Sequence, residues 1–158
     1  MNKFMPTLLD SFDKSILRAL QDDGRISNYD LAEKIGLTPS PCLRRTKKLE
    51  TDGVIDRYVA LIDPAKAGLP VTAFVRVRLD SQDDRTLAGF EERIGGFPEV
   101  MECYLMTGDA DYQLRVLVAS LAAFEDFLRS CLTKIPGVDQ VTTSFALRPI
   151  VYRTQLPV

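Results

Sequence analysis

The feature that most constrains this chain is a series of three closely spaced helical segments near its start, each with its own start signal. Asp10 precedes an apolar pattern at helical spacing, and Ser27 precedes a second, shorter pattern that Gly36 ends. Thr38 followed by Pro39 opens a third segment, because a hydroxyl suits the N-cap and proline suits the first helical position. Two helices joined by a short glycine-containing turn form a helix-turn-helix unit. We therefore expect such a domain at the N-terminus.

The third segment turns a basic, hydroxyl-bearing side away from its apolar stripe. At about 100° per residue, Cys42, Thr46 and Leu49 form one inward stripe. A basic helix side in isolation is usually only solvated, but on the third helix of a helix-turn-helix domain it favours contact with DNA. The predicted DNA-contacting residues are Ser40, Pro41, Arg44, Arg45, Lys47 and Lys48, with Arg45 and Lys47 assigned to backbone phosphates.

The charge distribution agrees with this assignment better than the net charge does. The chain carries a net charge of −2, yet residues 1–60 hold ten Lys and Arg against nine Asp and Glu. Between Glu33 and Glu50 there are five basic residues and no acidic one. Because a phosphate backbone responds to local clusters of charge rather than to the net charge, we expect double-stranded DNA as a partner.

The residue types change after the third helical segment. Residues 54–63 are rich in β-branched and aromatic side chains and predict an extended ribbon, consisting of a wing and a connecting strand. Pro64 and Pro70 then interrupt the chain. We place the domain boundary there, with a winged helix-turn-helix domain at 1–63 and a second domain at 64–158.

The second half alternates between strand and helix patterns. Small and aliphatic residues alternate with Phe74, Arg76 and Arg78, as in a strand that is buried on one side. The predicted order is strand 73–79, a helix begun by Asp83 or Asp84, strand 100–107, strand 112–119, a helix begun by Ser120, and strand 138–147. This β-α-β-β-α-β order is the ferredoxin-like arrangement, so the expected fold class is α+β.

A four-stranded sheet with both helices on one face leaves its other face bare. Phe74, Arg76 and Arg78 fall on the bare face, together with apolar residues of the other strands. A partly apolar bare face is usually covered by a partner, so we expect a homodimer formed through the second domain. The tail 148–158 is too apolar for a free end and is expected to pack across that dimer.

The residues that the chain lacks narrow its function. It has no histidine, so a Ser-His-Asp or Cys-His site is impossible within one chain. Cys42, Cys103 and Cys131 are far apart and contain no CxxC pair, so we expect three buried thiols. No apolar run reaches the roughly 20 residues that span a bilayer, and no signal peptide is evident. We expect a cytoplasmic protein that is not an enzyme and uses no metal or cofactor.

Three stretches of the chain together resemble the sequences of one known protein family. They are residues 9–27, residues 36–55 with Tyr58 and Asp63-Pro64 after them, and Thr-Gly-Asp-Ala-Asp-Tyr-Gln-Leu at 107–114. In this order and spacing they resemble the Lrp/AsnC (leucine-responsive/asparagine, or feast/famine) family of transcription regulators. The resemblance implies dimers that assemble further, to tetramers or octamers. It also implies DNA binding by the winged helix-turn-helix and a response to an amino acid in the ferredoxin-like domain.

The Gly-Asp-Ala-Asp-Tyr turn, taken alone, is typical of a plain hairpin. The resemblance implies that an effector lies near it, at an interface between dimers. We expect the ammonium of an amino acid to pair with Asp109 or Asp111, and turn N–H groups around Gly108 to bind its carboxylate. The predicted effector-binding residues are Tyr104, Met106, Gly108, Asp109, Asp111 and Tyr112.

These predictions combine into one mechanism with alternatives. Each dimer presents two recognition helices to DNA, and an amino acid changes the assembly equilibrium by binding one assembly state better than another. One alternative is an architectural or constitutive DNA-binding protein without an effector. Another is an amino-acid sensor that has lost DNA binding, which the basic stretch argues against. A third is an enzyme that holds a metal at Asp109 and Asp111, which the absence of histidine disfavours.

Overall fold

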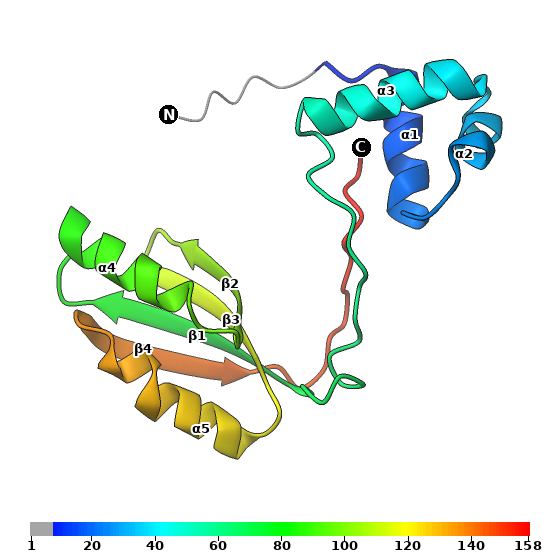
Figure 1. The fold of residues 1–158 in the computed structure, drawn as a ribbon. Coiled ribbons are helices and arrows are strands. Elements are labelled where there is room, and N and C mark those ends of the chain that lie inside the picture. Colours follow the sequence, from blue (N-terminus) through cyan, green and yellow to red (C-terminus); the bar gives the residue numbers. More distant parts are fainter. Residues whose placement is uncertain (1–7) are drawn as a thin grey trace. The chain divides into compact units, whose positions relative to one another are not determined.

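The computed structural model describes residues 8–158 and divides into two compact units (Figure 1). The first unit ends at Leu61 and also takes in Val151–Val158, and the second unit comprises Ile62–Ile150. Two covalent connections therefore join the units. The division lies close to the boundary predicted after residue 63, but the tail belongs to the first unit, whereas the sequence analysis placed it in the second.

Three helices form the first unit: α1 (Ser11–Asp22), α2 (Asn28–Ile35) and α3 (Pro39–Thr51). At the start of α1, the Asp10 side chain accepts from the Asp13 N–H and the Asp13 side chain accepts from the Asp10 N–H. The Ser27 side chain caps α2 by accepting from the N–H of Asp30, and Gly36 ends α2 at φ 72°. These start and stop signals are confirmed.

The start of α3 differs from the prediction in one respect. Thr38 occupies the N-cap position, but its hydroxyl makes no capping hydrogen bond. A capping side chain bonds the N–H of the second or third helical residue. The third residue here is Pro41, which has no N–H. The fixed φ angle of Pro39 at the first position remains as the local start signal.

The helices enclose a small apolar core. Cys42 and Leu49 of α3 are buried, as predicted, and the half-buried Thr46 donates its hydroxyl to the Cys42 carbonyl at 3.1 Å. This bond gives a hydroxyl on the inward stripe an acceptor within its own helix. The buried core residues are Ile16, Leu17, Ala19, Leu31, Ala32, Cys42 and Leu49.

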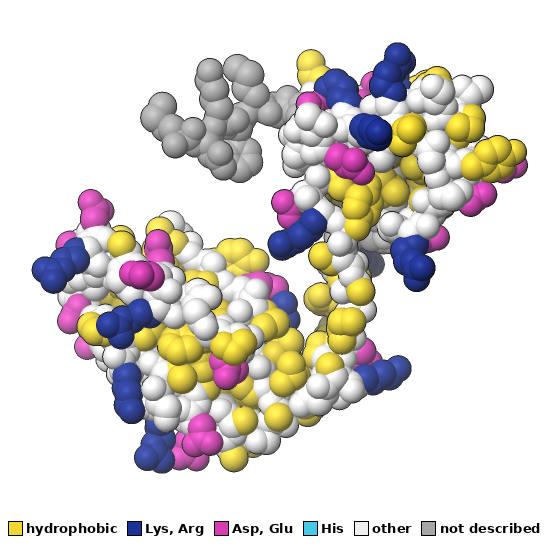
Figure 2. Space-filling model, in the orientation of Figure 1, with side chains coloured by type: hydrophobic (Ala, Val, Ile, Leu, Met, Phe, Trp, Pro, Cys, Tyr) yellow, Lys and Arg dark blue, Asp and Glu magenta, His cyan; other side chains and the backbone are white. Residues whose placement is uncertain are grey.

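The predicted strand at 54–63 is not formed. Val54 and Ile55 fold back instead, donating their N–H groups to the Leu49 carbonyl at 2.9 and 3.1 Å and packing on the helical core. Asp56 to Asp63 carries no strand structure. A strand needs a neighbouring strand to satisfy its backbone groups, and this segment has none. Its β-branched and aromatic side chains stay exposed, visible in yellow on the stretch that joins the units in Figure 2.

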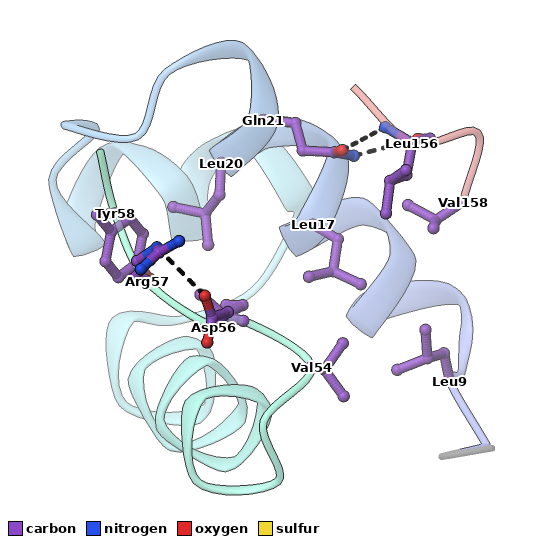
Figure 3. Close-up of a pocket in the computed structure, with 11 residues that line it drawn as sticks. Leu9, Leu17, Leu20, Gln21, Val54, Asp56, Arg57, Tyr58, Leu156 and Val158 are labelled. Carbon is purple, nitrogen blue, oxygen red and sulfur yellow. Dashed lines mark hydrogen bonds and ion pairs between the residues drawn. The ribbon is translucent and has the colours of Figure 1, made fainter. Parts of the chain in front are cut away.

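The tail packs on α1 of its own chain, and its packing across a dimer stays a prediction. The Leu156 N–H donates to the Gln21 side-chain oxygen at 2.6 Å, and the Gln21 amide nitrogen donates to the Leu156 carbonyl at 3.2 Å. Arg18 donates to the Val158 carbonyl at 2.8 Å. Figure 3 shows the apolar cavity of about 250 Å³ beside this contact, with Leu17 and Leu20 directed toward it. The tail contacts both apolar side chains and polar groups of α1. The sequence of the tail alone does not indicate this docking site.

The second unit is a four-stranded antiparallel sheet with two helices on one face (Figure 1). The strand order is β2-β3-β1-β4, the order expected of a ferredoxin-like fold. Asp83 and Ser120 cap the two helices, as predicted. The elements in chain order are β1 (Val71–Leu79), α4 (Asp84–Ile94), β2 (Val100–Leu105), β3 (Tyr112–Val118), α5 (Leu121–Ser130), a 3-10 helix η1 (Leu132–Lys134) and β4 (Val138–Phe145).

Strand β1 is a central strand of the sheet, because it pairs with β3 on one side and with β4 on the other, and its alternating side chains lie on the two faces. Ala73, Val75 and Val77 are fully buried in the core under the helices. Their neighbours in sequence point to the face without helices, here called the open face, as predicted. One row across the open face consists of Tyr104, Gln113, Arg76 and Thr142, and the next consists of Glu102, Arg115, Phe74 and Ser144.

The cysteines are less uniformly buried than predicted. Cys42 is buried and Cys131 is half-buried, but Cys103 is exposed. Cys103 lies on β2, an edge strand of the sheet, which has a neighbour on one side only. The position of a strand within its sheet is not encoded in the strand's own residues, so the sequence did not reveal this exposure.

We expect the substitution Gln21→Ala to release the tail, because it removes both hydrogen bonds to Leu156. Amide hydrogen exchange should show lost protection at Leu156, and the unfolding free energy should fall by about 1–2 kcal/mol, the net value of two hydrogen bonds. Lys14→Ala, an exposed substitution on the same helix, is the control and should change neither value. Unchanged exchange at Leu156 in Gln21→Ala would contradict the docked tail.

Candidate functional site

One side of α3 faces solvent, and it is the predicted side. Ser40, Arg44, Lys47 and Lys48 are all exposed, whereas Pro41 is half-buried. Pro41 therefore offers DNA part of a ring and no polar group. The exposed residues bring hydroxyl and cationic groups together on one helix surface.

One residue of this surface was not among the predicted DNA contacts. Leu43 is 43% exposed between the polar side chains. Apolar side chains on a recognition helix contact the methyl group of thymine. At 100° per residue, Leu43 lies on the flank of the inward stripe, so the periodicity alone did not predict its exposure. We call Ser40, Leu43, Arg44, Lys47 and Lys48 the outer face of α3.

Arg45 is half-buried and is paired with carboxylates of its own chain. Its Nη1 donates to Asp10 Oδ2 at 2.7 Å and to Asp13 Oδ1 at 2.8 Å, and its guanidinium carbon lies 5.5 Å from the centre of the Phe12 ring. The N–H of Asp13 and the Arg45 guanidinium hold the pKa of Asp10 below its usual value. Arg45 thus ties α3 to the start of α1. Its contact with a DNA phosphate stays a prediction. In the structure, its side chain holds two helices of the first unit together.

The three cations of the outer face of α3 differ in whether they pair with a carboxylate. Lys48 pairs with Asp52 one turn further along the helix, which raises the pKa of Lys48. Arg44 and Lys47 have no carboxylate partner within residues 8–158. Their charges are therefore available to an external anion.

Two contacts fix both ends of α3. At its start, the Asn28 amide donates to the Pro39 carbonyl at 2.9 Å, which joins α2 to α3. At its end, the Tyr58 hydroxyl donates to Glu50 at 2.9 Å, and burial, followed by this carboxylate, raises the pKa of Tyr58 to about 12. The helix that carries the outer face is therefore anchored at both ends by side chains from neighbouring segments.

In the second unit, two of the predicted effector-binding residues point inward. Asp111 is buried and accepts hydrogen bonds from the Leu79 N–H and the Gln82 amide, both at 2.7 Å. Tyr112 is 1% exposed, stacks on Phe90 and donates its hydroxyl to Glu91 at 2.8 Å. Burial, followed by the Glu91 bond, raises the pKa of Tyr112. The carboxylate of Asp111 is satisfied within the protein, so it joins strands rather than presenting a charge to solvent.

The other four predicted residues reach the surface. Tyr104 and Met106 are about half exposed, and Gly108 adopts φ 116°, a left-handed conformation that favours glycine. Asp109 is exposed at the tip of the turn. Tyr104 lies on the open face, whereas Met106 follows the end of β2.

A shallow cleft of about 180 Å³ adjoins this turn on the open face. Its lining includes Asp109 from the predicted set and four side chains of β1 and β4 that the sequence analysis did not assign to a site. The lining residues are Arg76, Arg78, Asp109, Ala110, Gln140 and Thr142. Two arginines at positions i and i+2 of one strand were the available signal, since such residues share a face; their proximity to the turn depends on strand pairing.

Residues 8–158 contain no group of three or more cysteine, aspartate or glutamate side chains arranged to hold a metal ion. Among the same residues, no helix has the length and apolar character needed to cross a membrane.

Each of the two units matches a known domain family. Residues 9–56 match the family model for a winged helix-turn-helix DNA-binding domain, and residues 72–156 match the model for the Lrp/AsnC ligand binding domain. The chain is 48% identical over 149 residues to the Bkd operon transcriptional regulator of Pseudomonas aeruginosa, covering 94% of this chain and 97% of that protein.

Solved structures give the same result. An AsnC family transcriptional regulator from Agrobacterium tumefaciens is 46% identical, with a TM-score of 0.90, over 94% of this chain and 97% of the other. A transcriptional regulator from Neisseria meningitidis, solved as a complex with L-Met, is 37% identical, with a TM-score of 0.91, over 95% of this chain and 97% of the other. Both similarities cover the two units together.

We expect Arg45→Ala to lower the melting temperature at neutral pH, because α3 loses its tie to α1. The carboxylate of Asp10 has a lowered pKa, so its stabilisation is complete above about pH 4 and is lost as the pH falls through the lowered value. The difference in melting temperature between wild type and Arg45→Ala should therefore shrink below about pH 4. Arg44→Ala is the control without an internal partner; equal melting temperatures for all three proteins would refute the tie.

We expect Asp111→Ala to destabilise the second unit by about 1–3 kcal/mol, the cost of leaving the buried Leu79 N–H without an acceptor. Asp109→Ala, two residues away and exposed, should leave the unfolding free energy unchanged. Urea unfolding of the two variants checks both values. Equal stability of Asp111→Ala and wild type would show that the carboxylate does not hold β1 to β3.

Proposed function

Since the chain belongs to the Lrp/AsnC family of transcription regulators, we propose that it binds double-stranded DNA through the outer face of α3 and responds to an amino acid bound in the second unit. The observation that carries this proposal is the pair Arg44 and Lys47, exposed and without carboxylate partners in residues 8–158, on the third helix of a helix-turn-helix unit. A recognition helix of this type enters the major groove.

The outer face of α3 provides each kind of contact that sequence readout requires. The Arg44 guanidinium has the planar, two-donor geometry that binds the edge of guanine. The Ser40 hydroxyl bonds either base edges or phosphates, and Leu43 offers an apolar contact. Lys47, and Lys48 once separated from Asp52, neutralise phosphates. We therefore propose sequence-specific rather than purely electrostatic binding.

The proposal of an amino acid effector rests on two lines of support. The regulator from Neisseria meningitidis was solved with L-Met, and the second unit of this chain matches the ligand binding domain of the same family. The second unit also has polar groups that could contact a ligand, at the Gly108 turn and at the exposed Asp109 beside a cleft. A cytoplasmic location is part of the proposal, because a regulator must reach the DNA that it binds.

The open face supports a homodimer that assembles further. Phe74 is 42% exposed and Tyr104 is 55% exposed on a sheet face that no helix covers. Leu105 and Met106 extend this apolar surface around the exposed edge strand β2. Burying such side chains removes apolar area from water, and a second copy of the same face is self-complementary about a two-fold axis. The exposed edge of β2 then remains for contacts between dimers, to tetramers or octamers.

The test is selection of bound sequences from random double-stranded DNA, followed by affinity measurements at several salt concentrations. Arg44→Ala should reduce the preference for the selected sequence about tenfold or more. Lys47→Ala should weaken binding to all sequences about equally and lower the salt slope by about one. Lys134→Ala, an exposed cation of the second unit, is the control and should match wild type.

The outcomes separate the alternatives. Absence of any enriched sequence would replace sequence-specific regulation by architectural binding. Affinities of Arg44→Ala and Lys47→Ala equal to that of wild type would refute the outer face of α3 as the DNA contact. If DNA affinity stays the same with each of the twenty amino acids added, the protein is a constitutive regulator and not an amino acid sensor.

A further inference from the structure

We propose that a cleft along α4 binds the phosphate group of a small phosphorylated metabolite, held between Arg85 and Arg93. The cleft lies within the second unit, and its lining combines residues of α4 with the turn that precedes β4. None of the residues predicted to contact DNA or an amino acid lines it. The inference therefore adds a second ligand and is independent of the proposed function.

The first step is the alignment of two arginines on α4. Arg85, Gly89 and Arg93 follow one another at intervals of four residues, so they lie on one side of the helix. All three line the cleft, and basic and acidic side chains gather over this helix in Figure 2. The two arginines start about 12 Å apart along the helix axis. Because Gly89 has no side chain, their long side chains can meet above it around one ligand group.

The second step is the charge state of these arginines. Both are exposed, and neither forms an ion pair within residues 8–158. Ion pairs on a helix join residues three or four positions apart. Although α4 contains three acidic residues, none lies three or four positions from Arg85 or Arg93. Two guanidinium charges on the wall of one cleft are therefore available to an external anion.

The third step is the glycine between the arginines. Gly89 lies inside α4, where glycine destabilises a helix relative to alanine. Packing does not require glycine here, because a Cβ at this position would meet no atom within 4 Å. A ligand group seated above the helix backbone accounts for the missing side chain, since any side chain at this position would take up part of that space.

The fourth step is the pair of carboxylates that line the same cleft. Asp83 is occupied, because it accepts from the Thr86 N–H at 2.9 Å and from the hydroxyls of Thr86 and Ser81 at 3.0 and 2.6 Å. Asp80 forms no ion pair within the described part of the chain, and its N–H donates to the Gly137 carbonyl at 2.8 Å. The cleft thus offers two free cations and one free carboxylate on a fixed turn.

The fifth step matches these groups to a ligand. A phosphate monoester carries a charge of about −1.5 to −2 at neutral pH, and its oxygens accept the two-donor fork of a guanidinium. A single carboxylate, as in an amino acid, would neutralise only one of the two arginines. Asp80 can accept a hydrogen bond from a hydroxyl near the phosphate. The volume of about 410 Å³ lies in the range of small-molecule sites, so we infer a phosphate ester of a hydroxylated metabolite, such as a sugar phosphate.

The test is calorimetry of the full-length protein with glycerol phosphate, ribose 5-phosphate and glucose 6-phosphate, beside inorganic phosphate, sulfate and ribose. At least one ester should bind more tightly than inorganic phosphate, and ribose should not bind measurably. Arg85→Gln and Arg93→Gln should each weaken the tightest ester tenfold or more, because a charge-assisted hydrogen bond to phosphate is lost. Arg129→Gln, an exposed substitution on α5 outside the cleft, is the matched control and should bind as wild type does.

Two further variants separate binding from stability. Gly89→Ala should raise the melting temperature by a few degrees, because alanine favours a helix and its Cβ meets no atom. The same variant should weaken the ester threefold or more, a loss that unfolding cannot explain in a protein that melts higher. Asp80→Ala should lower the preference for the ester over inorganic phosphate, because the acceptor for the ligand's hydroxyl is removed.

Several outcomes would overturn the inference. Failure of all three esters to bind, or equal ester binding by wild type, Arg85→Gln and Arg93→Gln, would refute the site. Sulfate binding as tight as that of the esters would show that the cleft attracts anions without selecting a phosphate ester. If both variants lower DNA affinity and its salt slope while no ester binds, the arginines contact the DNA backbone instead. Each of these results leaves the DNA contact of α3 and the amino acid response to their own measurements.

Discussion

The period-two alternation of β1 is the constraint on which the second unit depends. Ala73, Val75 and Val77 face the helices without any exposed surface, and this burial sets which face of the whole sheet is covered. A shift of one residue would send the arginines into the core, at the cost of burying unpaired charges. The same alternation therefore builds the core and places Arg76 on the open face beside the Gly108 turn.

The first unit is held together differently, because its core is small. Its seven buried apolar residues are supplemented by polar ties that join segments distant in sequence. Arg45 connects α3 to α1, Asn28 connects α2 to α3, and Gln21 holds the tail. Each tie fixes the orientation of an element, which packing of a few aliphatic side chains leaves loosely determined. The direction in which the outer face of α3 points thus depends on side chains outside that face.

The quality of the sequence-based predictions follows the range of the interactions involved. The caps at Asp10, Ser27 and Asp83 and the buried stripe of α3 are local patterns, and the structure agrees with them. The strand at 54–63 was predicted from residue types alone, and it fails because strand formation needs a partner. Asp111 was assigned to the ligand because the family resemblance places an effector near its turn and a carboxylate can pair with an ammonium. In the structure, Leu79 and Gln82, distant in sequence, donate to its carboxylate instead.

The sequence by itself determined the three N-terminal helices, the order of elements in the second unit and the basic side of α3, because periodicity and capping act within a few residues. Tertiary structure alone decided which charges are free. Arg44 and Arg45 are adjacent, yet one is exposed and the other is bound to two carboxylates. Arg76 and Arg78 alternate on one strand, yet only the second pairs with a carboxylate among residues 8–158. Whether a charge is available to a ligand depends on neighbours brought together by folding, and the sequence pattern does not contain them.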